Sequence, residues 1–145
     1  MMQQTRMTFS QGVIAGFRKL AVLDGRSRRM ELASYGIVVT AVCLAVAVLL
    51  PTTSLKLGTL IVYALLMFSV LWRRFQDVGR EGYNVAILYL LLYGLTADFG
   101  FEGENYFKLA MTGIAGVLLF LLMKDCKEPR NKYGLSPKYT ELLLL

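Results

Sequence analysis

Four apolar runs, each bounded by charged segments, constrain this chain more than any other feature. They cover residues 32–50, 57–72, 83–97 and 107–123, and Lys108 is the single Asp, Glu, Lys or Arg that falls within them. A soluble amphipathic helix needs a polar face along its length, whereas these runs are apolar all round. As a helix, the run 32–50 would be about 28 Å long, close to the thickness of the hydrocarbon core of a bilayer. We therefore predict four membrane-spanning helices.

A soluble four-helix bundle with very apolar helices is the competing interpretation, because the other three runs have only about 15–17 residues, the lower limit for crossing a bilayer. Composition favours the membrane: 56% of the 145 residues are hydrophobic and 18% are charged, more extreme than a soluble domain of this size. The predicted fold class is thus all-α, an integral membrane four-helix bundle preceded by a short amphipathic interfacial helix.

The basic residues alternate from loop to loop. All but two of the 16 Lys and Arg residues fall in the segments 6–29, 73–80 and 124–138; the exceptions, Lys56 and Lys108, lie near the two other connections. This alternation is typical of the positive-inside rule, and it predicts that both termini and the loop 73–82 are cytoplasmic. A nucleic-acid surface would instead collect its basic residues on one face, so we expect no nucleic acid partner.

The organisation follows from these patterns. Residues 1–8 form a polar N-terminus, and residues 9–31 a cytoplasmic amphipathic helix followed by a basic turn. The four-span domain covers residues 32–123, and residues 124–145 form a basic cytoplasmic tail with a turn at 131–134. The amphipathic helix could lie on the membrane surface or pack on the ends of the bundle. Gly12 and Gly16 are spaced like a helix-dimer motif but precede the first span, so we interpret them as incidental.

Two groups of arginines flank the first two spans on the predicted cytoplasmic side. Glu31 can meet Arg28 at helical spacing, and Asp77 can accept from Arg73 or Arg74. One hypothesis is a structural ion-pair network, because an arginine near the acyl boundary needs a carboxylate partner. The other is a clamp for an anionic headgroup. The candidate residues are Arg26, Arg28, Arg29, Glu31, Arg73, Arg74 and Asp77.

Chemistry within the spans is not indicated. The sequence has no histidine, and its two cysteines, Cys43 and Cys126, fall at different predicted depths, so we expect no disulfide, no metal site and no cofactor. A coupled transporter usually carries an ionisable group at mid-depth, and the runs lack one there. The chain is therefore not expected to be an enzyme, and Asp77 is the one plausible acid–base group.

Small and hydroxylated residues in the spans predict helix packing. Tyr89 and Tyr93 share a helix face and are expected to form interhelical hydrogen bonds. Two pairs of small residues allow close helix approach, within the chain or against partners: Ala41 with Ala45, and Gly113 with Gly116.

Three islands of sequence carry a family resemblance. Residues 25–31 (GRSRRME) resemble a Gly-Arg-x-x-Arg-x-Glu motif, residues 73–83 (RRFQDVGREGY) an Arg-Arg-Leu-His-Asp-x-Gly-x-x-Gly-Trp loop, and residues 131–137 (NKYGLSP) an Asn-x-Tyr-Gly-x-x-Pro tail. In this order the islands resemble the domain-of-unknown-function 805 family of small bacterial inner-membrane proteins, over roughly residues 15–138. Gln76 stands where the family usually has histidine. The resemblance implies a topology and a bacterial inner-membrane location more than an activity.

These observations together predict a non-catalytic multi-pass membrane protein that is an accessory, assembly or regulatory subunit of a larger membrane complex. The expected partners are anionic lipid headgroups at the inner face and other membrane subunits, or further copies of the chain. The alternative is a protein that binds or handles anionic lipid through its cytoplasmic arginines.

Overall fold

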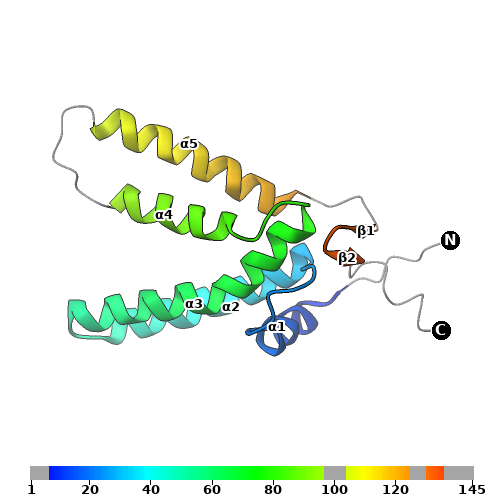
Figure 1. The fold of residues 1–145 in the computed structure, drawn as a ribbon. Helices are drawn as coiled ribbons and strands as arrows, with labels where there is room; N and C mark the ends of the chain where they lie inside the picture. The colour runs from blue at the N-terminus through cyan, green and yellow to red at the C-terminus, as the bar shows by residue number, and fades with distance from the viewer. Residues whose placement is uncertain (1–6, 97–103, 125–129, 136–145) are drawn as a thin grey trace.

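The computed structural model describes residues 7–96, 104–124 and 130–135. Its helices pair into two antiparallel hairpins, α2 with α3 and α4 with α5 (Figure 1). A short helix precedes the first hairpin, and two very short antiparallel strands follow the second. The elements are α1 (Phe9–Arg18), α2 (Arg29–Leu49), α3 (Thr53–Asp77), α4 (Asn84–Thr96), α5 (Glu104–Met123), β1 (Arg130–Asn131) and β2 (Gly134–Leu135).

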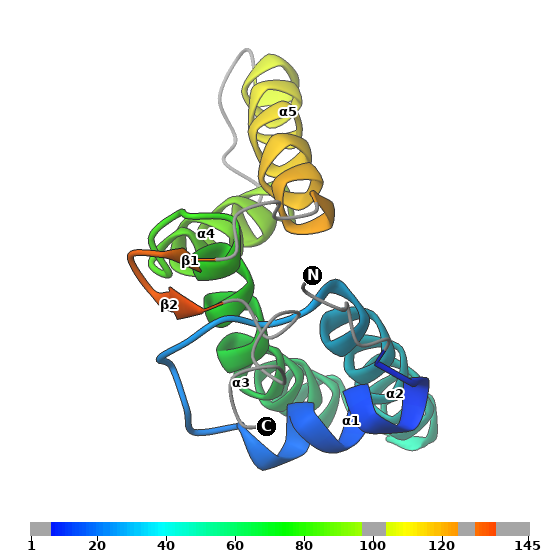
Figure 2. The same ribbon diagram turned by 90° about the vertical axis from the view of Figure 1, so that its right-hand side faces the viewer.

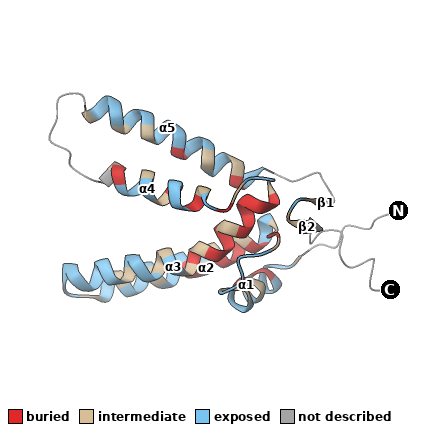
Figure 3. Cartoon of the chain, viewed as in Figure 1, coloured by how far each residue is buried: buried red, intermediate tan, exposed pale blue. Residues whose placement is uncertain are grey.

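The core lies at one end of the molecule, where the C-terminal end of α3 meets α1, the start of α2 and the end of α5. Buried residues gather there, while the far halves of the helices are mostly exposed (Figure 3). Tyr35, Val70, Phe75 and Val85 are completely buried in this core. Away from it the two hairpins diverge (Figure 1). Most of the buried residues that join the two hairpins therefore lie at this one end.

The exposed halves of the helices are apolar. Leu49 is 82% exposed and Leu65 69%, and at most 22% of the apolar window of any long helix is buried. Exposed apolar surface on this scale does not suit a monomer in water. Three helices, α2, α3 and α5, are long and apolar enough to cross a membrane. The structure thus favours the membrane interpretation over the soluble bundle.

The third predicted span, at residues 83–97, is shorter in the structure than the others. α4 has 13 residues, about 20 Å at 1.5 Å per residue, whereas α2 has 21 and α3 has 25. Among the described residues, three of the four predicted spans therefore meet the length of a membrane crossing. The structure has apolar helices at all four predicted positions, and α4 is shorter than a usual crossing.

Gly12 and Gly16 are not incidental, and that interpretation was wrong. Both are buried where α1 crosses the start of α2. A Cβ on Gly12 would lie 2.1 Å from Ser34 Oγ, and one on Gly16 would lie 2.3 Å from the Tyr35 ring. The missing side chains let the two helices touch, as small residues do between membrane helices. The axis of α1 runs across the axes of α2 and α3 (Figures 1 and 2).

The element bounds also differ from the prediction. α3 continues five residues past Trp72, through the arginines, and ends at Asp77; Gly79 then adopts a positive φ of 79°. At its other end α3 begins at Thr53, because the Thr52 side chain accepts from the Leu55 amide as an N-cap. The predicted turn at residues 131–134 is present, but the short strands on either side of it were not predicted.

Candidate functional site

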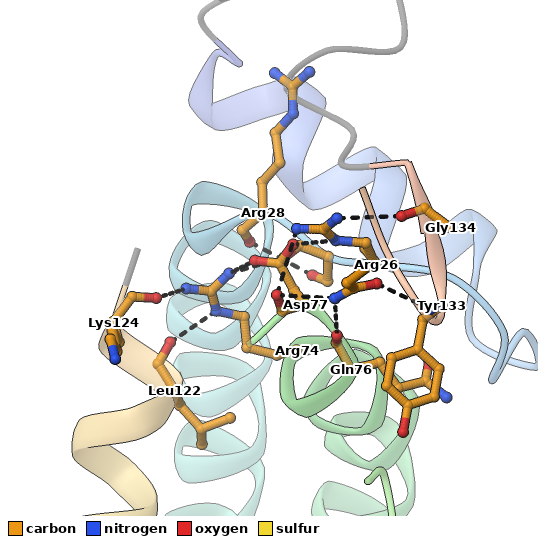
Figure 4. A network of polar contacts seen from close by, with 11 residues as sticks. Arg26, Arg28, Arg74, Gln76, Asp77, Leu122, Lys124, Tyr133 and Gly134 are labelled. Atoms are coloured by element: carbon orange, nitrogen blue, oxygen red, sulfur yellow. Dashed lines mark hydrogen bonds and ion pairs between the residues drawn. The ribbon is translucent and has the colours of Figure 1, made fainter. Parts of the chain in front are cut away.

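The polar residues of the buried end form a network that we call the arginine clasp: Arg26, Glu31, Arg73, Arg74 and Asp77. Asp77 is its centre. Its Oδ1 accepts from Arg26 Nε at 2.8 Å, and its Oδ2 accepts from Arg74 Nη1 (Figure 4). A third ion pair joins Arg73 Nη1 to Glu31 Oε1 at 2.7 Å. Each of these five residues is at most 4% exposed, so water screens none of the three pairs strongly.

Arg74 joins the two hairpins. From α3 its Nε donates to the Leu122 carbonyl at 2.7 Å and its Nη2 to the Lys124 carbonyl at 2.6 Å, both at the end of α5. Its Nη1 also donates to the Ser27 carbonyl at 3.0 Å. The last carbonyls of a helix have no partner within the helix, so the Arg74 guanidinium caps α5 while it pairs with Asp77.

The other two arginines of the clasp cap helices as well. Arg26 Nη2 donates to the Asp77 carbonyl at the end of α3 at 3.4 Å, and Arg73 Nη2 to the carbonyl of Lys19, the C-cap of α1, at 3.5 Å. Three guanidiniums thus face two carboxylates and three helix C-termini. Each C-terminus is equivalent to about −0.5 charge, so the helix dipoles offset the surplus positive charge.

Gln76 lies at the same buried end of the molecule and forms hydrogen bonds to the connection between α1 and α2. Oriented to satisfy its neighbours, its amide donates to the carbonyls of Leu23 at 2.9 Å and Gly25 at 2.7 Å and accepts from Trp72 Nε1 at 3.0 Å. Trp72 in turn packs on Gly82, where a Cβ would lie 2.1 Å from the indole. A side chain that both donates and accepts meets these demands; the Gln76 amide donates twice and accepts once, whereas a neutral histidine has a single donor and a single acceptor. Gln76 therefore holds the 20–25 connection against α3.

The tail hairpin docks on the clasp. Asn131 Nδ2 donates to the Gln76 carbonyl at 2.8 Å, and Arg26 Nη1 donates to the Gly134 carbonyl at 3.2 Å (Figure 4). At its tip, Lys132 forms an ion pair with Glu81, and Tyr133 Oη donates to Glu81 Oε2 at 2.6 Å. We call this contact of Glu81, Lys132 and Tyr133 the tail latch.

The tail latch shifts the pKa values of its members. The hydrogen bond from Lys132, followed by that from Tyr133, lowers the pKa of Glu81 below its ordinary value. The hydrogen bond to Glu81 raises the pKa of Lys132. Burial, followed by the hydrogen bond to Glu81, raises the pKa of Tyr133. All three shifts favour the charge states in which the latch is closed at neutral pH.

The predicted candidates divide into two groups. The structure brings together Arg26, Glu31, Arg73, Arg74 and Asp77. Glu31 pairs with Arg73 of α3, where the sequence had suggested Arg28. Arg28 points away from Asp77 (Figure 4), and Arg29 is exposed. Neither residue is in the clasp, because the chain turns at Gly25, with φ of 101°, and enters α2 at Arg29.

The structure also places other residues that the sequence analysis singled out. Tyr89 Oη donates to the Ala64 carbonyl at 2.7 Å, the expected interhelical bond, whereas Tyr93 is 71% exposed. A Cβ at Gly113 or Gly116 would meet nothing within 4 Å, so neither permits close approach within the chain. Cys43 is a free thiol, and Cys126 lies outside the described residues. The described residues contain no group of His, Cys, Asp or Glu that could hold a metal.

Sequence reasoning missed the part of the site made by the backbone. The arginines donate to the carbonyls of Lys19, Leu122, Lys124 and Gly134. Because every residue has a backbone carbonyl, the sequence does not indicate which ones accept. Asn131 and Gly134 did carry a signal, the tail island of the family resemblance, but it indicated a turn and not its docking on Arg26.

This fold and site define a class: a helical membrane protein in which a buried network of arginines and acids joins the ends of the helices at one side. Residues 20–135 match the family described as protein of unknown function (DUF805), and the chain belongs to that family. The predicted resemblance is thereby confirmed. No curated protein and no solved structure matches the chain.

Proposed function

We propose that this chain is a non-catalytic multi-pass membrane protein that is an accessory, assembly or regulatory subunit of a larger membrane complex. The observation that carries the proposal is that the charged groups of the clasp form their hydrogen bonds and ion pairs with groups of the same chain. Both oxygens of Asp77 accept from arginines, and all three nitrogens of Arg74 donate within the chain. A general acid or base must reach a substrate proton, and Asp77 is 4% exposed. The clasp suits structure better than chemistry.

The outer surface of the helices supports a role in assembly. Gly113 and Gly116 lie on an open face of α5, where a Cβ would meet nothing in the chain. Small residues on an open face allow another membrane helix to approach closely. The pair was predicted to serve packing within the chain or against partners, and the second possibility is the one that this proposal retains.

The mass of the protein in mild detergent tests the proposal. The chain alone has a mass of 16.3 kDa. Extracted from its native membrane, it should migrate as a discrete complex containing at least one other protein in fixed proportion. Replacing Gly113 and Gly116 with Leu should release that partner, whereas the same change at Ala86, an exposed small residue on α4, serves as the control. Recovery as a lone monomer or dimer would contradict the accessory role.

We further propose a bacterial inner-membrane location with four spans and both termini in the cytoplasm. The basic segments support this orientation, since the clasp, α1 and the tail hairpin lie at one end of the helices (Figure 1). The apolar residues Phe9, Ile14 and Phe17 of α1 are about half exposed, at 47%, 51% and 46%. A helix that lies across the spans with an apolar face open is suited to the membrane interface.

A further inference from the structure

An apolar groove lies between the diverging hairpins. Its volume is about 710 Å³, within the range of small-molecule sites. α2 and α3 form one wall, and α4 and α5 form the other. The lining residues that matter here are Gly36 and Ala41 on α2, Met67 on α3, Leu88 on α4, and Leu122 and Met123 on α5.

The inner end of the groove meets the basic end of the molecule. Leu32 of the lining follows the clasp residue Glu31, and the Leu122 carbonyl accepts from Arg74. Met123 precedes Lys124, whose exposed side chain points away from Asp77 (Figure 4). Its ammonium is therefore outside the clasp. The groove thus has an apolar interior and, next to its inner end, the exposed Lys124. We call this end of the groove the basic mouth.

The polar groups of the lining are already engaged within the chain. The hydroxyls of Thr40 and Tyr63 lie 3.3 Å apart, and Tyr89 Oη donates to the Ala64 carbonyl. Helices that associate in membranes commonly use interhelical hydrogen bonds, and each of these three hydroxyls already has one partner within the chain. An acyl chain needs apolar contact alone, and an anionic headgroup suits the basic mouth.

We propose that this groove is a binding site for an anionic phospholipid. An acyl chain lies between the hairpins, and the headgroup phosphate sits at the inner mouth beside Lys124. The site differs from the predicted arginine clamp, because the guanidiniums of the clasp hold the walls together and the lipid meets the basic mouth. It is independent of the accessory role, since the groove belongs to one chain.

Native mass spectrometry of the delipidated protein tests this proposal. Phosphatidylglycerol and phosphatidylcholine with matched acyl chains are added at equal concentration. The unaltered protein should retain one phosphatidylglycerol in preference to phosphatidylcholine. Ala41→Phe, which places an aromatic ring inside the groove, should weaken retention of both lipids. Ala45→Phe places the same ring one turn further along α2, outside the lining, and should leave retention unchanged.

A second pair of variants separates headgroup from chain. Lys124→Gln should reduce the preference for phosphatidylglycerol about fivefold, as expected for one lysine near an anionic headgroup, while Lys56→Gln at the opposite end should not. Equal retention in Ala41→Phe and Ala45→Phe would overturn the groove as the site. Equal binding of the two lipids by the unaltered protein would overturn the basic mouth. Loss of a protein partner in Ala41→Phe with lipid retention intact would also overturn the proposal, because a helix would then occupy the groove.

Discussion

At the scale of the residue, we expect Asp77 to contribute strongly to the stability of the fold, because its carboxylate pairs with two buried arginines. Asp77→Asn keeps the shape of the side chain and removes its charge, so Arg26 and Arg74 are left with an uncompensated charge. Losing one partner of a buried ion pair costs about 3–5 kcal/mol. Thermal unfolding in detergent, followed by the fluorescence of Trp72, the single tryptophan, should show a correspondingly lower midpoint. Asp24→Asn, at an exposed acid, is the control; equal midpoints in the two variants would contradict a structural role for Asp77.

The residue scale also shows how far sequence reasoning reached. The types and spacing of Arg73, Arg74 and Asp77 suggested either an ion-pair network or an anion clamp; in the structure Arg74 pairs with Asp77 and Arg73 with Glu31. The capping roles could not be predicted, because Arg74 finds its carbonyls 48 and 50 residues away at the end of α5. Helical spacing reports neighbours on one helix and says nothing of where another helix ends.

At the scale of the element, α1 depends on the two glycines that face α2. Gly16→Ala would place a Cβ 2.3 Å from the Tyr35 ring, so the helices must separate. Overpacking of this kind typically costs about 1–3 kcal/mol. The same change at Gly116, where a Cβ meets nothing, removes a flexible glycine from α5 and should be neutral or slightly stabilising. Thermal midpoints of the two variants check this; a Gly16→Ala midpoint equal to that of Gly116→Ala would refute the close α1–α2 contact.

The tail latch gives an element-scale dependence on pH. Because the pKa of Glu81 is lowered below 4.5, its contribution to docking is present above that ordinary value and is lost as pH falls through the lowered one. Because the pKa of Lys132 is raised above 10.5, its contribution persists below that value and is lost at higher pH. The latch should thus be closed from about pH 5 to pH 10.

Nuclear magnetic resonance of the Glu81 carboxyl carbon measures this directly. The titration midpoint should lie below 4.5 in the unaltered protein and should rise toward 4.5 in Lys132→Ala. Lys124→Ala, which removes a basic residue outside the latch, should leave the midpoint unchanged. A midpoint insensitive to Lys132 would show that the latch does not form in solution.

At the scale of the whole molecule, the proposed orientation can be mapped with single cysteines. In a chain with Cys43 and Cys126 replaced by Ser, a cysteine at Ser54 should react with a membrane-impermeant maleimide in intact cells. A cysteine at Arg80, between α3 and α4, should react only after the membrane is opened. Both positions are exposed, so burial does not affect the comparison. The opposite pattern would reverse the topology.

The sequence predicted four apolar helices but not how they pack. A run that is apolar on all sides indicates a nonpolar surrounding without indicating which face meets another helix. The divergence of the hairpins therefore could not be foreseen, nor the groove between them. Gly113 and Gly116 show the same limit, because their spacing suggested close packing and the chain packs elsewhere.

The arginine caps also set an order for biogenesis. Arg26 and Arg74 leave the ribosome before the tail hairpin, which supplies an acceptor to Arg26, and before the end of α5, which supplies two acceptors to Arg74. Until those last segments arrive, the inner end of the first hairpin holds guanidiniums without all of their partners. A nascent chain therefore cannot complete its core early. In a chain cut short before Lys124, this polar surface stays exposed, and quality-control proteases are expected to recognise it as the mark of an unfinished membrane protein.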